Sequence, residues 1–327
     1  MGEGARNIRM RGMHFSEPRA TSKLAGVHNF TALIDVNLRQ CSRRDGAGMS
    51  LRPSGVWAAL VLLGLGAAWP AEAPAQKAPA VDRIRATYRL DLAAFNLGEL
   101  TVTANFNGSA YEMQAKGKFS LITGMLYRVS GKTQSKGEWS KRGPRPTKFT
   151  LSFESGSKKE KREMSFANGA VSDISIVPRK KQNPHRRVPV TQDQLANVLD
   201  PLTAAVLSAS SNGAQGDLAV CNRTVPVFDG QQRFDLVLKP KRVDNLGEDA
   251  PSKLSGPVAV CQVKYVPIAG YRPNQAGVKF VSENEDIEVW LVRVPNTALH
   301  LPYRIVMPTA WGTGSVTLTK IKMGLGD

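Results

Sequence analysis

The sequence lacks the residues and motifs on which most enzymes and cofactor-binding proteins depend. Among its 327 residues are three cysteines and four histidines, and aromatic residues make up only 7%. No Gly-x-Ser-x-Gly nucleophile motif, phosphate-binding loop, His-Glu-x-x-His zinc motif or dinucleotide-binding glycine pattern is present in it. The run Gly312-Thr313-Gly314-Ser315 has the composition of a turn without phosphate-loop spacing. We therefore expect no catalytic residues, no metal and no cofactor.

Acidic residues are also scarce, because 27 Asp and Glu face 44 Lys and Arg, which gives a net charge of +17. An excess of this size fits a nucleic-acid surface, an anionic envelope surface or simple solubility. Two basic runs lack the interleaved aromatic residues on which nucleic-acid bases stack. We expect either solvated charge or contacts with anionic lipid head groups or acidic envelope polymers, and no nucleic acid. The basic residues of the two runs are Lys158, Lys159, Lys161 and Arg162, then Arg179, Lys180, Lys181, Arg186 and Arg187.

No apolar run is long enough to cross a bilayer, which needs about 20 residues. The uncharged run 56–69 follows Arg52 and ends before the small-residue exit Ala73-Pro74-Ala75, a pattern typical of a secretory signal peptide. We predict a signal peptide over 49–75, cleaved after Ala75, and hence a periplasmic protein.

Since signal peptides begin a few residues before their apolar run, we expect translation to start at Met49. Residues 1–48 are then an over-extended gene-model start, the alternative being an unusually long leader. Residues 76–82 are rich in Pro and Ala and predict a linker to a single domain over 83–327. No cysteine closely follows the apolar run, which excludes a lipid-anchored exit.

Removing 75 of the 327 residues leaves 252, with 35 basic and 22 acidic residues and a net charge of +13. Only Cys221 and Cys261 remain in that mature chain. Two cysteines in an exported protein predict a disulfide, since a metal site needs further ligands and the histidines show no metal spacing to them.

The mature chain alternates apolar and polar residues in about a dozen short runs, many separated by turns such as Asn107-Gly108 and Asn168-Gly169. This pattern predicts antiparallel hairpins. Apolar residues at three-four spacing predict one helix over 191–209, with Thr191 as its N-cap, which Pro201 either kinks or splits in two. The expected fold is mainly β: a large curled antiparallel sheet or open β-barrel, with one inserted helical segment packed on its concave face.

Two groups of residues are candidate binding sites. An apolar group either lines a lipid-sized cavity inside the sheet or fills it as core, and it comprises Leu121, Ile122, Met125, Leu126, Tyr127, Leu195, Val198, Leu199 and Leu202. A polar group of Asp229, Arg233 and Asp235 either orients a ligand or forms a turn with a cross-strand ion pair. We favour the structural interpretation of the polar group.

The order of these features from Tyr88 onward resembles the DUF3108 domain family of bacterial exported and envelope proteins, which has no established activity. The most specific segment is Phe228-Asp229-Gly230-Gln231-Gln232-Arg233-Phe234-Asp235, and the opening pair of strands and the closing Val289-Trp290-Leu291 segment also carry the resemblance. The architecture is more weakly similar to the half-barrel lipoprotein carriers of the Lol system. That second likeness is an analogy and implies no function by itself.

These features favour a non-enzymatic binder or carrier of an apolar or amphipathic envelope component, with its basic loops facing an anionic surface. The alternative is a structural or assembly partner in the envelope without a small-molecule ligand. A third hypothesis is an enzyme acting on envelope polysaccharide through Asp229, Asp235 and His300.

Overall fold

The computed structural model describes residues 36–37, 81–122, 126–140, 143–178, 186–208 and 214–324. The predicted signal peptide, its cleavage site after Ala75 and residues 76–80 of the predicted linker lie outside these ranges. Within them, no helix is both long enough and apolar enough to cross a membrane.

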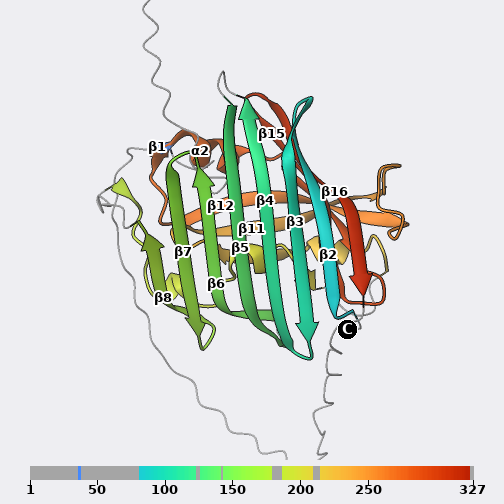
Figure 1. The fold of residues 1–327 in the computed structure, drawn as a ribbon, viewed down its shortest axis with the longest axis horizontal. Coiled ribbons are helices and arrows are strands. Elements are labelled where there is room, and N and C mark those ends of the chain that lie inside the picture. The colour runs from blue at the N-terminus through green and yellow to red at the C-terminus, as the bar shows by residue number, and fades with distance from the viewer. Residues whose placement is uncertain are drawn as a thin grey trace, which may run out of the picture.

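One antiparallel sheet contains most of the strands (Figure 1). Its strand order is β10-β11-β12-β14-β15-β16-β2-β3-β4-β5-β6-β7-β8, and β9 pairs with β15. The bounds are β2 Arg83–Leu92, β3 Phe95–Asn107, β4 Ala110–Ile122, β5 Leu126–Ser140, β6 Gly143–Ser155, β7 Lys158–Ala167, β8 Ala170–Val177, β9 Leu207–Ser208, β10 Arg223–Phe228, β11 Arg233–Asn245, β12 Pro257–Ala269, β14 Glu288–Arg293, β15 Leu299–Thr309 and β16 Gly312–Gly324.

The remaining elements are short. Two-residue strands β1 Val36–Asn37 and β13 Asn274–Gln275 pair with each other, and α2 Ala276–Glu283 follows β13 directly. The inserted segment between β8 and β10 contains a 3-10 helix, η2 Asp193–Leu195, and α1 Pro201–Ala204, and a second 3-10 helix, η3 Leu218–Cys221, precedes β10.

The sheet curls into two layers that enclose the core. In Figure 1 the long strands β3 to β7 run steeply across the front, and β11 and β12 cross behind them. The outer strands β8 and β10 do not pair with each other. Instead the inserted segment bridges them, because Ala196 pairs with Ala170 and Leu199 pairs with Val227. The predicted curled, open antiparallel sheet is therefore confirmed.

The helix predicted over 191–209 is wrong in extent. Only α1, one turn long, is α-helical there, and β9 forms where the helix was expected to end. The residue before a proline avoids the helical region, and Asp200 before Pro201 is extended at ψ 159°. Asn197 takes a positive φ of 55°, which also interrupts a helix. The segment still packs inside the curl, where α1 contacts β4, β5 and β10.

A buried polar network fixes α1 to the inner face of the sheet. Asp200 caps α1 by accepting hydrogen bonds from the backbone of Leu202 and Thr203. Its other oxygen accepts from the hydroxyls of Ser135 at 2.7 Å and Thr203 at 2.6 Å. Tyr111 of β4 bonds Thr203 at 3.0 Å. Burial raises the pKa of Asp200, and these four hydrogen bonds act against that shift because they replace the water that a buried carboxylate lacks.

The interior is filled by side chains in two clusters. The larger cluster lies under β2 to β7, and the smaller lies around η3, β10 and β12, where Cys221 and Cys261 form the predicted disulfide. A cavity of about 20 Å³ beside Tyr88 and Val206 has room for one water and not for a lipid.

Candidate anion-binding face of the sheet

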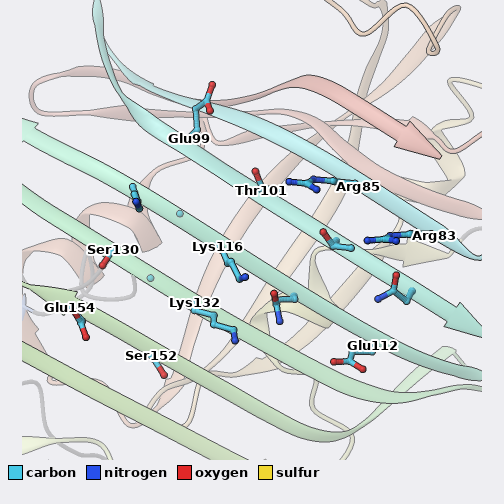
Figure 2. Close-up of a pocket in the computed structure, with 16 residues that line it drawn as sticks. Arg83, Arg85, Glu99, Thr101, Glu112, Lys116, Ser130, Lys132, Ser152 and Glu154 are labelled. Carbon is cyan, nitrogen blue, oxygen red and sulfur yellow. The ribbon is translucent and has the colours of Figure 1, made fainter. Parts of the chain in front are cut away.

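The outward side of β2 to β6 forms an open hollow of about 970 Å³ (Figure 2). Strand alternation produces it, since Met113 and Ala115 of β4 point into the core while Glu112, Gln114 and Lys116 line the hollow. Its floor carries hydroxyl and amide groups, five basic side chains and three acidic ones. The charged members are Arg83, Arg85, Lys116, Lys118, Lys132, Glu99, Glu112 and Glu154.

Two lysines stand opposite each other at the centre of the hollow. Lys116 of β4 is the register partner of Lys132 of β5, and Figure 2 shows their side chains next to each other. Directly opposed like charges destabilise an antiparallel pair. Along the same row, Lys116 faces Thr101 on β3 and Lys132 faces Ser152 on β6, so neither side neighbour neutralises them.

Two of the three acids of the hollow pair with lysines outside it, and the third, Glu99, is opposite Lys118. Glu112 pairs with Lys136 at 3.2 Å, and Glu154 pairs with Lys159 at 3.0 Å. Within the described ranges, neither Lys116 nor Lys132 forms an ion pair. Two adjacent ammonium groups bordered by hydroxyls can hold a carboxylate, sulfate or phosphate group, and the hydroxyl and amide groups can bind sugar hydroxyls.

The apolar candidate residues of the inserted segment pack in the core. Leu195, Val198 and Leu202 are buried in the larger core cluster, and Leu199 packs against the smaller one. The backbones of Leu121, Ile122, Leu126 and Tyr127 form the paired ends of β4 and β5. Their side chains, and Met125, lie outside the described part of the chain. The structure therefore supports the core interpretation for the residues of the inserted segment.

The polar candidate residues separate into two structural groups. Asp229 accepts hydrogen bonds from the backbone of Gln231 and Gln232 in the turn between β10 and β11. Arg233 pairs with Asp235 at 2.6 Å on its own strand, not with an acid on the partner strand as expected, and also donates to the Gln194 carbonyl. Asp229 thus shapes a turn, and Arg233 ties β11 to the inserted segment through the Gln194 carbonyl, in line with the favoured structural interpretation.

The first basic run is split between two faces of β7. Lys159 and Lys161 point outward and pair with Glu154 and Glu163 at 3.0 Å, and Lys158 is also exposed. The prediction that Arg162 faces an anionic surface is wrong. Strand alternation places Arg162 on the inner face of β7 with Glu160 and Met164. There it is 1% exposed and contacts Glu160 at 2.7 Å and Asp229 at 3.2 Å.

Of the second basic run, the structure describes only its last two arginines. Arg186 is exposed, and Arg187 donates to the Gly270 carbonyl at 2.6 Å. Arg179, Lys180 and Lys181 lie outside the described residues. His300, considered above as a catalytic group, is buried at 3% exposure, and burial lowers its pKa to about 4, reinforced by the charges of Arg293 and Arg223.

Sequence reasoning missed Lys116, Lys132, Arg83 and Arg85. The available signal was weak, because each residue is a polar position in an alternating strand. What brings them together is the register of four strands, which the sequence does not display. Among the described residues, no three His, Cys, Asp or Glu side chains gather as a metal site.

Comparisons with known proteins identify the family. No curated protein matches the chain in sequence. Among solved structures, it is similar to one titled a beta-barrel-like protein of domain of unknown function DUF1849 from Brucella abortus. That match has 10% identity and a TM-score of 0.45, and it covers 76% of this chain and 99% of the other. The family model described as protein of unknown function DUF3108 matches residues 87–319, which include β3 to β15 entirely. The chain therefore belongs to the DUF3108 family.

Proposed function

We propose that this is an exported, non-enzymatic protein of the cell envelope that binds an acidic envelope polymer across the outer face of β2 to β6. The observation that carries the proposal is the opposed pair Lys116 and Lys132 without carboxylate partners in the described chain. Arg83 and Arg85 line the same hollow. An anionic group seated between the lysines relieves their mutual repulsion.

The form of the hollow supports a long ligand over a small one. It is open and spans five strands, with hydroxyl or amide side chains from β3 to β6 around the basic centre. A chain of sugars bearing acidic groups matches both kinds of lining. The small interior cavity leads us away from the expectation of a lipid held inside the sheet.

Export is supported by the sequence of residues 49–75 and by the disulfide, because disulfides persist mainly in oxidising compartments. N-terminal sequencing of protein recovered from the periplasm tests this part, with an expected start at Gln76. A mature start before Met49 contradicts it.

The binding test uses polygalacturonate, an acidic glycan, with neutral dextran as the matched polymer. The variant Lys116→Gln/Lys132→Gln removes two charges from the hollow. Lys264→Gln/Lys279→Gln removes two charges from exposed lysines on β12 and α2 and controls for net charge. Each basic residue beside an anionic surface contributes about 1 kcal/mol. We therefore expect a roughly thirtyfold weaker affinity for the first variant only.

The proposal fails if polygalacturonate and dextran bind alike, or if both double variants weaken binding equally. Size-exclusion chromatography of the polymer after incubation tests the non-enzymatic part. An unchanged chain length is expected, and shortening of the polymer by the wild-type protein contradicts it.

A further inference from the structure

One edge of the sheet collects the hairpin ends that join β2 to β3 and β15 to β16. The two turns lie side by side, because the Ala93 amide donates to the Thr313 carbonyl at 2.8 Å. The paired ends of β4 with β5 and of β6 with β7 follow along the same edge, since Gly98 is opposite Phe119 and Val129 is opposite Ser155. In Figure 1 this is the upper edge of the front layer.

The most exposed large hydrophobic residues of the described chain all lie on this edge. Trp311 is 74% exposed, Phe95 61% and Val177 59%. Val177 belongs here because it is opposite Lys161 near the start of β7. The hairpin turns at the other end of the same strands have the polar sequences Asn107-Gly108-Ser109 and Asn168-Gly169. The three most exposed large hydrophobic residues of the described chain thus share one end of the front layer, while Val243, Ile174 and Phe280 are exposed to a smaller extent on β11, β8 and α2.

The turn that carries Trp311 is held in a defined shape. The Thr309 hydroxyl donates to the Gly312 carbonyl at 2.6 Å and accepts from the Trp311 amide at 3.2 Å. The indole is therefore presented outward by an ordered hairpin. An exposed aromatic residue on a fixed turn loses little conformational entropy on binding.

Basic residues border the aromatic residues along the edge. Lys118, Arg128 and Lys158 are exposed near the ends of β4, β5 and β7. Two of the nearby acids already have partners, because Asp91 pairs with Arg89 at 2.9 Å and Glu154 pairs with Lys159. The acid Glu99 stands opposite Lys118 across the strands. The edge combines protruding aromatic residues with an excess of positive charge.

We propose that this edge docks on an anionic lipid bilayer, with Trp311 and Phe95 inserted at the level of the head groups. Tryptophan concentrates at membrane interfaces because its ring is apolar and its N–H is polar. Lysine and arginine beside it attract anionic lipids. Separate protruding tips bury too little area to hold a second copy of the chain by themselves. The two inserted residues, Trp311 and Phe95, lie outside the hollow, although Lys118 borders both surfaces, and the inference does not depend on the proposed polymer binding.

The test measures co-sedimentation of the mature protein with vesicles of phosphatidylethanolamine and phosphatidylglycerol in a three-to-one ratio. Phosphatidylcholine vesicles are the uncharged comparison. Trp311→Ser is expected to weaken partitioning into the anionic vesicles about tenfold, and Trp311→Ser/Phe95→Ser more, because apolar area leaves the interface. Val243→Ser, at a 52% exposed valine of β11, is the matched control and should bind as the wild type does.

Lys116→Gln/Lys132→Gln separates this surface from the outer-face site and should stay within about threefold of wild type in vesicle binding, since its charges lie away from the tips. Brominated lipids should quench the fluorescence of wild-type protein more than that of Trp311→Ser. The inference is overturned if the wild type does not sediment with anionic vesicles, or if the aromatic variants sediment equally well. A dimer in sedimentation velocity that Trp311→Ser dissociates would also overturn it, by assigning the edge to self-association.

Discussion

The substitution Arg162→Met tests how the two ends of the curled sheet are held together. Arg162 lies on β7, and through Asp229 it contacts the turn after β10, at the far end of the strand order. It also pairs with Glu160, and all three side chains are at most 4% exposed. The arginine therefore connects two strands that do not pair with each other.

Methionine keeps the apolar stem but removes the charge, so two buried carboxylates lose their contact with the arginine. Breaking a buried ion pair in this way costs about 3–5 kcal/mol. For a domain of this size about 2–4 °C are lost per kcal/mol, so we expect the melting temperature to fall by roughly 6–20 °C.

The assay is urea and thermal unfolding of the oxidised mature protein, with Lys161→Met as the matched control. Lys161 immediately precedes Arg162 and points outward. Its side chain is 51% exposed and pairs with Glu163, so removing this ion pair should cost less than about 1 kcal/mol. The double variant Arg162→Met/Asp229→Asn should recover part of the lost stability, because it removes the charge of one of the two buried carboxylates. The reasoning is refuted if Arg162→Met is no less stable than Lys161→Met.

Three further predictions concern the core. Asp200→Ala should cost about 3 kcal/mol in urea unfolding, because α1 loses its cap and buried hydroxyls lose an acceptor; a change as small as that of exposed Asp193→Ala would argue against the network. Reducing Cys221–Cys261 with dithiothreitol should lower stability by about 3–4 kcal/mol, while the double alanine variant should be insensitive to reductant. Because burial lowers the pKa of His300 to about 4, the unfolded chain binds its proton first as the pH falls. Stability should then drop by up to about 3 kcal/mol between about pH 6.5 and pH 4 and level off below; an identical pH dependence in His300→Asn would contradict this.

The sequence determined the local structure of this protein well. Alternation and Asn-Gly turns specify hairpins, and the observed turns at Gly108 and Gly169, both with positive φ, are those predicted. The inserted segment was harder, since three-four spacing is also produced by Leu195, Val198 and Leu202 packing into one core without a continuous helix. There Pro201 and the extended Asp200 outweighed periodicity.

Tertiary structure alone decided which charges matter. Arg162 and Lys161 are adjacent in one basic run, yet strand alternation and the position of Asp229 bury the first and expose the second. Lys116 and Lys132 become neighbours only through the register of β4 with β5, and Phe95 and Trp311 only through the pairing of β16 with β2. Local patterns depend on each residue and its close neighbours in the chain, so the sequence could specify strands, turns and the disulfide. Long-range register depends on how the whole sheet closes over its core, so the residues that meet in the candidate sites could be identified only from the folded structure.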